Sequence, residues 1–162
     1  MTCSQITIGE IQPLVDGTPQ APTITAEGQD GAGQQCVFRV SNPDEEDGRT
    51  VDILVESGSL ATDGYAQELA SATGPVMLTG IGDKGFRETG DDQVTALKGD
   101  TYCSVTLGSG DTIKGVGPIE SAHGGTSDIG EANNAIVAAA LGTLCNRIYG
   151  SGNTTPDLSG LS

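Results

Sequence analysis

Residues 127–149 read SDIGEANNAIVAAALGTLCNRIY, and their apolar side chains recur at steps of three and four. That spacing is the period of one face of an α-helix, so the segment is predicted to form a helix laid against a core. Ser127 is placed to cap the start of this helix, and Gly150 follows it, where helices commonly stop. The predicted buried stripe comprises Ile129, Asn133, Ile136, Ala140, Leu144 and Ile148, with Val137, Leu141 and Cys145 alongside.

Cys145, on the flank of this stripe, is placed to tie the helix to another element through a disulfide. The chain holds three further cysteines, Cys3, Cys36 and Cys103, and no two of the four form a C-x-x-C pair. A four-cysteine zinc site is therefore not expected. Two disulfides allow three connectivities. We predict Cys3–Cys36, joining the opening segment to the first strand, and Cys103–Cys145. Disulfides indicate an oxidising compartment.

The charge of the chain is strongly one-sided. Lys and Arg total 7 against 22 Asp and Glu among 162 residues, a formal net charge of -15. Such a surface repels phosphate groups, so neither nucleic acid nor an anionic membrane is an expected partner. Aromatic residues are scarce, with 3 Tyr, 2 Phe and no Trp, which disfavours a platform for stacking sugars or bases. The length predicts one domain.

No segment has the basic and then apolar organisation of a signal peptide. The longest apolar run, residues 135–141, is too short to cross a bilayer, so no transmembrane segment is expected. We expect the chain to be the mature part of an exported protein whose leader has been removed.

The order of the predicted elements indicates an α+β fold, with a single largely antiparallel sheet, helices packed on a face and two disulfides. Residues 1–150 are predicted to form one domain, followed by a flexible tail at 151–162 that is rich in Gly, Ser and Pro. Residues 16–35 and 108–126 are predicted to be long loops, with a short strand at 23–26 as an alternative within the first. Predicted helices lie at 3–15 and 59–72, and predicted strands at 36–41, 50–57, 76–79, 86–89, 93–98 and 101–107.

Four features follow one another along the chain: Cys3 beside a short capped helix, Cys36 opening a strand, GIGDKGF, and VTALKGDTYCSVTL before a final Ala-rich helix. In this order they resemble the extracytoplasmic domains of small actinobacterial lipoproteins and secreted proteins of the DUF3558 type, a largely uncharacterised family. The resemblance implies an envelope or secreted location and no catalytic residues. In such proteins the first cysteine of the mature chain can carry a lipid, so Cys3 is either lipidated or paired with Cys36.

Two short sequences resemble motifs of nucleotide binding or catalysis. Residues 80–85, GIGDKG, satisfy G-x-G-x-x-G, but a strand rather than a helix is predicted to follow, so a structural turn is favoured over a dinucleotide site. His123 precedes two glycines as in an esterase oxyanion loop. Because the chain has no G-x-S-x-G nucleophile elbow, an exposed loop histidine is the favoured interpretation.

The charged clusters allow two interpretations each. Asp44, Glu45, Glu46 and Asp47 could gather around Ca²⁺, but they do not alternate with spacers as calcium ligands do, so a solvated hairpin turn is favoured. Asp63 and Glu68 are also interpreted as solvated surface, although paired carboxylates for glycoside hydrolysis stay open because their separation depends on the fold. Lys84 and Arg87 are candidate contacts for an anion or an acidic partner, but pairing with the surrounding acidic residues is the favoured interpretation.

We therefore expect a non-enzymatic extracytoplasmic domain, secreted or attached to the envelope, that binds a partner protein, an envelope component or a small ligand without a cofactor. A lipid anchor in the full-length precursor is a further expectation. The two predicted loops are the expected contact regions. One alternative is a carboxylate- or metal-dependent hydrolase, which predicts a pocket where acidic side chains converge. The other is a structural or assembly module, which predicts an exposed apolar patch.

Overall fold

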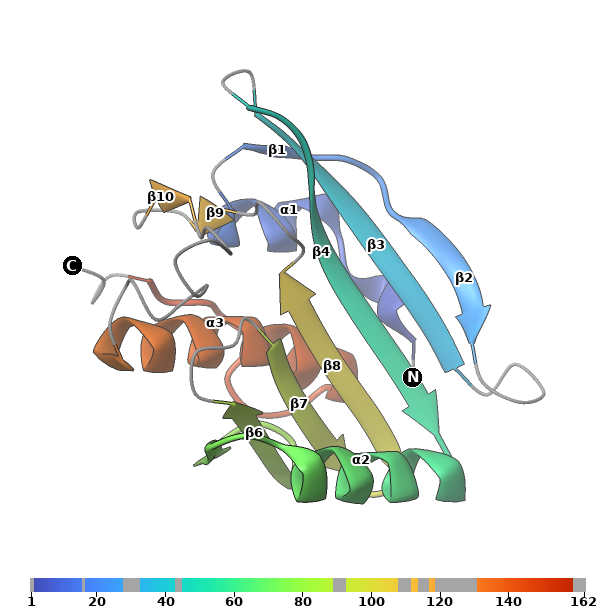
Figure 1. The fold of residues 1–162 in the computed structure, drawn as a ribbon. Helices are drawn as coiled ribbons and strands as arrows, with labels where there is room; N and C mark the ends of the chain where they lie inside the picture. Colours follow the sequence, from blue (N-terminus) through green and yellow to red (C-terminus); the bar gives the residue numbers. More distant parts are fainter. Residues whose placement is uncertain are drawn as a thin grey trace.

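The computed structural model describes residues 2–15, 17–27, 33–42, 45–88, 93–107, 112–113, 117–118 and 131–158. Within those residues the main strands are β1 (Thr18–Pro19), β2 (Thr23–Glu27), β3 (Gly33–Asn42), β4 (Glu45–Ser57), β5 (Pro75–Leu78), β6 (Lys84–Glu88), β7 (Gln93–Lys98) and β8 (Thr101–Leu107). They form one eight-stranded sheet in the order β1-β3-β4-β8-β7-β6-β5, with β2 also pairing β3. All its pairings are antiparallel, which confirms the predicted α+β fold (Figure 1).

The described helical elements are η1 (Cys3–Gln5), α1 (Ile8–Ile11), η2 (Gln12–Leu14), α2 (Ser59–Ser71) and α3 (Glu131–Tyr149). α3 is the helix predicted from the apolar stripe, and it ends as expected, because Gly150 adopts a φ of 72°. The predicted cap at Ser127 lies outside the described residues.

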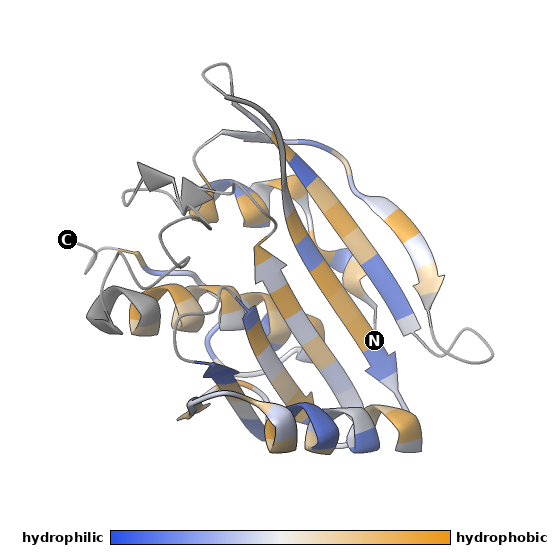
Figure 2. Ribbon diagram, in the orientation of Figure 1, coloured by the Kyte–Doolittle hydropathy of each residue, from blue (hydrophilic) through white to orange (hydrophobic). Residues whose placement is uncertain are grey.

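The two faces of the sheet are covered by different helices. Val51, Ile53 and Val55 point to the face covered by α3 and η1, here the α3 face, whereas Leu54 points to the face crossed by α2, here the α2 face. This alternation follows from the two-residue period of a strand and is visible along β4 and β8 in Figure 2. The main core lies on the α3 face. A smaller core on the α2 face contains Ala61, Tyr65, Phe86, Leu97 and Tyr102.

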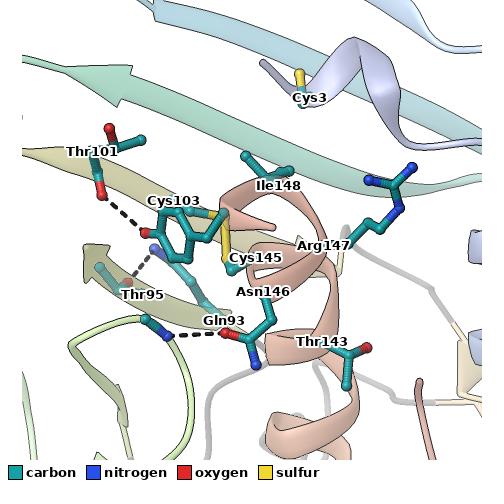
Figure 3. The surroundings of a disulfide bond; sticks show 12 residues. Cys3, Gln93, Thr95, Thr101, Cys103, Thr143, Cys145, Asn146, Arg147 and Ile148 are labelled. Atoms are coloured by element: carbon teal, nitrogen blue, oxygen red, sulfur yellow. Dashed lines mark hydrogen bonds between the residues drawn. A yellow bond between two sulfur atoms is a disulfide. The ribbon is translucent and has the colours of Figure 1, made fainter. Parts of the chain in front are cut away.

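Both predicted disulfides are confirmed. Cys3 is bonded to Cys36, with Cα atoms 6.0 Å apart, and this bond fastens η1 to β3. Cys103 is bonded to Cys145, with Cα atoms 5.8 Å apart, and this bond fastens β8 to α3 (Figure 3). All four cysteines are fully buried in the main core.

The predicted helix at 3–15 is wrong as a continuous element. Three short helical turns replace it, because Thr7 is extended, with φ -97° and ψ 160°, and Pro13 cannot donate a backbone hydrogen bond. The predicted cap of the middle turn is present: Glu10 Oε2 accepts a hydrogen bond from Thr7 N at 3.3 Å.

The prediction of a long loop at 16–35 is wrong, because β1, β2 and the start of β3 lie within it, but the short strand allowed at 23–26 is present as β2. The structure pairs β2 with β3, and its side chains at Thr23 to Ala26 are exposed, so the strand shows no apolar alternation. In the predicted loop at 108–126, β9 (Thr112–Ile113) and β10 (Gly117–Pro118) form a separate small hairpin, and the other residues lie outside the described ranges.

The described part of the predicted tail lies against the domain. Asn146 Nδ2 donates to Asn153 O at 3.0 Å, Ser151 N donates to Asn146 O at 3.1 Å, and Leu158 packs on the main core. Residues 159–162 are outside the described ranges.

Candidate functional site

A cleft of about 140 Å³ lies on the α2 face, between the C-terminal half of α2 and strands β6 and β7. Its six lining residues form three pairs, one on each element. Residues three apart on a helix, or two apart on a strand, lie on the same side of that element, so both residues of each pair face the cleft. The pairs are Glu68 and Ser71 on α2, Phe86 and Glu88 on β6, and Gln93 and Thr95 on β7. The antiparallel register places Phe86 directly opposite Thr95.

A chain of hydrogen bonds converges on Glu68. Gln93 Nε2 donates to Thr95 Oγ1 at 3.3 Å, and Thr95 Oγ1 donates to Glu68 Oε2 at 3.4 Å (the first bond is drawn in Figure 3). From the neighbouring strand β8, the hydroxyl of Tyr102 lies 2.8 Å from both carboxylate oxygens of Glu68. Neutral donors therefore fix the position of a carboxylate at the wall of the cleft.

The hydroxyl of Tyr102 is held in its protonated, donating form. Burial raises the pKa of Tyr102 far above its usual value of about 10, and the negative charge of Glu68 raises the pKa further. The tyrosine therefore stays a hydrogen-bond donor to Glu68 throughout the physiological pH range.

The apolar side of the cleft is Phe86, which is 3% exposed. Its ring meets Tyr65 of α2 edge to face, with centroids 5.4 Å apart and planes at 75°. The ammonium of Lys84 lies over the ring of Tyr65, 5.1 Å from its centroid. The Phe86 ring that lines the cleft is therefore packed against Tyr65 of α2.

The predicted pair of cations does not form one site. Lys84 and Arg87 are three positions apart on β6, an odd number, so they point to opposite faces of the sheet. Lys84 is exposed on the α2 face, whereas Arg87 is 4% exposed and stands opposite Val94 on the α3 face. Neither residue lines the cleft.

Residues 80–83 of GIGDKG form a turn, as predicted, and the last two residues of the motif begin β6 rather than a helix. Buried Asn146 of α3 holds the turn from both sides: its Oδ1 accepts from Gly82 N at 3.0 Å, and its Nδ2 donates to Gly80 O at 2.7 Å (Figure 3 draws the first bond). Asp83 Oδ2 accepts from Gly99 N at 2.8 Å, which connects this turn to the β7–β8 turn. The turn thus has a structural role at the sheet edge.

The other predicted sites lie beyond what the structure describes. His123 and Asp44 are outside the described ranges, and nothing is described of the side chains of Glu45, Glu46 and Asp47. Among the described residues, no three His, Cys, Asp or Glu side chains gather as metal ligands would. None of the helices described here has the length and apolar character needed to cross a bilayer.

Sequence reasoning missed most of the cleft. Glu68 was interpreted as solvated surface, and it is exposed, but nothing indicated that it lines a cleft. Phe86 and Thr95 lie within the two sequences that carry the family resemblance, and the other three lining residues belong to no motif. The available signals were the three-residue and two-residue spacings of the pairs. Spacing fixes a face but does not show which helix crosses which strands, so the three elements that line the cleft could not be brought together in advance.

No family model, no curated protein and no solved structure matches this chain.

Proposed function

We propose that this chain is a non-enzymatic extracytoplasmic domain that binds a group of a partner protein, an envelope component or a small ligand in the cleft between α2 and strands β6 and β7. The observation that carries this proposal is the fixed position of Glu68, which accepts hydrogen bonds from Tyr102 and Thr95 at the cleft wall. Polar groups that are ordered before binding cost less to immobilise when a ligand arrives.

The size of the cleft narrows what it holds. About 140 Å³ is well below the roughly 300–1,000 Å³ of sites that enclose a drug-sized ligand. We therefore propose that a single side chain or head group enters the cleft, while the rest of the bound molecule lies outside it.

The extracytoplasmic location is supported by the two disulfides, since such bonds persist in oxidising compartments. The resemblance to DUF3558-type domains implies the same location and belongs to the proposal. The sulfur of Cys3 is bonded to Cys36 and so carries no lipid. A lipid anchor is proposed only for a precursor, at another residue. Non-reducing peptide mapping of the chain from its own host tests the location: both bridges are expected, and free thiols would contradict it.

Filling the cleft tests the binding site. Ser71→Phe places a ring in the cleft, whereas Ala70→Phe places the same ring on a neighbouring exposed position of α2 outside the lining. Immobilised wild-type protein and the Ala70→Phe variant are expected to retain the same component of a host envelope extract, and the Ser71→Phe variant to lose it. Equal retention by all three proteins would place the binding site elsewhere.

The presence of Glu68 and Glu88 in one cleft favours a second candidate, a carboxylate-dependent hydrolase. Glycoside hydrolases use a pair of carboxyl groups on either side of the scissile bond. This candidate predicts turnover of aryl glycosides that Glu88→Gln abolishes. Ligand retention without turnover would favour the binding function.

A further inference from the structure

We propose that the cleft, taken as the binding site proposed above, recognises a primary ammonium group. This group belongs either to a lysine side chain of a partner protein or to a small free amine. The proposal combines the charge of the cleft, the direction of its hydrogen bonds and its apolar side.

The charge of the cleft lining is negative. Glu68 and Glu88 are its two ionisable residues. The ion pair given for the described residues joins Arg147 to Glu10 and involves neither cleft carboxylate. A bound cation would therefore supply a counter-charge to two carboxylates that take part in no ion pair given for the described residues.

The hydroxyl protons around the cleft are already used within the protein. Those of Tyr102 and Thr95 point to Glu68. Ser71 Oγ donates to backbone carbonyls one turn earlier on α2, at 3.0 Å and 3.3 Å. The groups that can still contact a ligand are therefore mostly hydrogen-bond acceptors. They are the two carboxylates, the hydroxyl oxygen of Ser71 and the amide oxygen of Gln93.

An acceptor-rich site matches a ligand that only donates. A primary ammonium group has three N–H donors and no acceptor, whereas a carboxylate, phosphate or carbonyl ligand would present acceptors to acceptors. Phe86 gives the methylene next to the nitrogen an apolar surface. It is a single ring in the lining rather than a cage of rings, so a quaternary ammonium, which lacks N–H donors, is expected to bind poorly.

The test is an NMR titration of the ¹⁵N-labelled, disulfide-intact chain with n-butylammonium chloride, beside tetramethylammonium chloride and NaCl at equal ionic strength. Saturable shifts are expected for n-butylammonium at the backbone amides of the cleft residues, and not for the other two salts. Glu68→Gln and Glu88→Gln are each expected to weaken binding about tenfold, as expected for loss of a charge-assisted bond.

Asp63→Asn is the matched control, because it removes the same charge from an exposed position of the same helix outside the cleft. Equal weakening in this variant, or equal shifts with tetramethylammonium or NaCl, would overturn the proposal in favour of general charge attraction. The absence of saturable shifts would also overturn it.

A second titration with an acetylated and amidated Gly-Lys-Gly peptide identifies the source of the ammonium. Tighter binding than n-butylammonium assigns it to a partner's lysine, and equal binding assigns it to a free amine. The retention experiment with Ser71→Phe tests the location of the binding site, independently of the titrations, which test the class of ligand. Retention that depends on Ser71 but not on ammonium would keep the site and reject this ligand class, whereas failure of both would reject the site.

Discussion

At the scale of single residues, two tyrosines of the α2 face have opposite hydrogen-bond states. Tyr65 and Tyr102 are both buried, with 1% and 4% of their surfaces exposed. Tyr102 donates to Glu68, whereas the hydroxyl of Tyr65 has no hydrogen-bond partner among the described residues. A buried polar group without a partner costs about 1–3 kcal/mol, so the same hydroxyl stabilises the fold at one position and destabilises it at the other.

Tyr65→Phe is therefore expected to raise the free energy of unfolding by about 1 kcal/mol, since it removes the unpaired hydroxyl and keeps the ring against Phe86. Tyr102→Phe is the matched control and should lower the same quantity by about 1.5–3 kcal/mol, the value of a bond to a charged group. Urea denaturation of the disulfide-intact variants measures both changes. A loss of stability in Tyr65→Phe would contradict this assignment.

Alkaline pH should destabilise the protein through Tyr102 and Tyr149. Burial raises the pKa of both phenols, so the folded state keeps their protons above pH about 10, where the unfolded chain releases them. The unfolded state then binds fewer protons, and the free energy of unfolding falls as pH rises. This stabilisation is complete below pH about 10 and is lost above it, by up to about 1.4 kcal/mol per pH unit for each tyrosine.

Urea denaturation at a series of pH values measures how steeply the free energy of unfolding falls with pH. The series runs from about two pH units below to about one above the ordinary pKa of tyrosine. Tyr149→Phe is expected to reduce this slope, although the variant also loses the hydrogen bond from the Tyr149 hydroxyl to Thr101 O. An unchanged slope in this variant would show that Tyr149 does not contribute.

At the scale of elements, the turn GIGDKG is packed onto α3 through the contact between Ile81 and Gly142. A Cβ atom at Gly142 would overlap the side chain of Ile81, and Ile81 itself is buried in the main core. The same turn is held by the two hydrogen bonds of Asn146, one turn further along the helix. Gly142 is thus required by a close approach between elements rather than by backbone conformation.

Gly142→Ala is expected to lower the free energy of unfolding by about 1–3 kcal/mol, because overpacking outweighs the gain in helix propensity of up to about 1 kcal/mol. Gly64→Ala on α2 is the control, since a Cβ there meets no atom within 4 Å. That variant should gain up to about 1 kcal/mol. Thermal unfolding compares the two, and a gain in both would mean that Ile81 moves aside without cost.

The sequence predicted the strands whose residue types and connecting turn are typical of a hairpin. The strands at 93–98 and 101–107 were predicted with the bounds they have, because residues that favour strands lie on either side of a two-residue turn in which Gly99 adopts a φ of 59°. β2 was predicted only as an alternative to loop, at 23–26, because an edge strand with exposed side chains has no apolar alternation. The cleft was missed because it depends on the path of α2 across the sheet, which places Glu68 beside Tyr102 although 34 positions separate them.

At the scale of the whole molecule, the two disulfides close segments of similar length, with separations of 33 and 42 residues. On loop-closure entropy, each is expected to contribute about 4 kcal/mol. Replacing either pair with alanine should therefore lower the free energy of unfolding by similar amounts. Urea denaturation of the two double variants measures this, and a large difference between them would show that contacts in the folded state, rather than loop length, set the contribution.

Both disulfides belong to the α3 face, away from the cleft, whereas α2 is held to the sheet by the non-covalent contacts of its small core. The α3 face is therefore cross-linked by disulfides, whereas α2 is expected to unfold locally more readily. A helix held by fewer buried contacts opens locally at a lower free energy. Backbone amides of α2 should exchange hydrogen with solvent faster than those of the central turns of α3. A ligand bound between α2 and the strands would slow that exchange. The hydrogen-exchange rate of the α2 amides would therefore measure how fully the cleft is occupied.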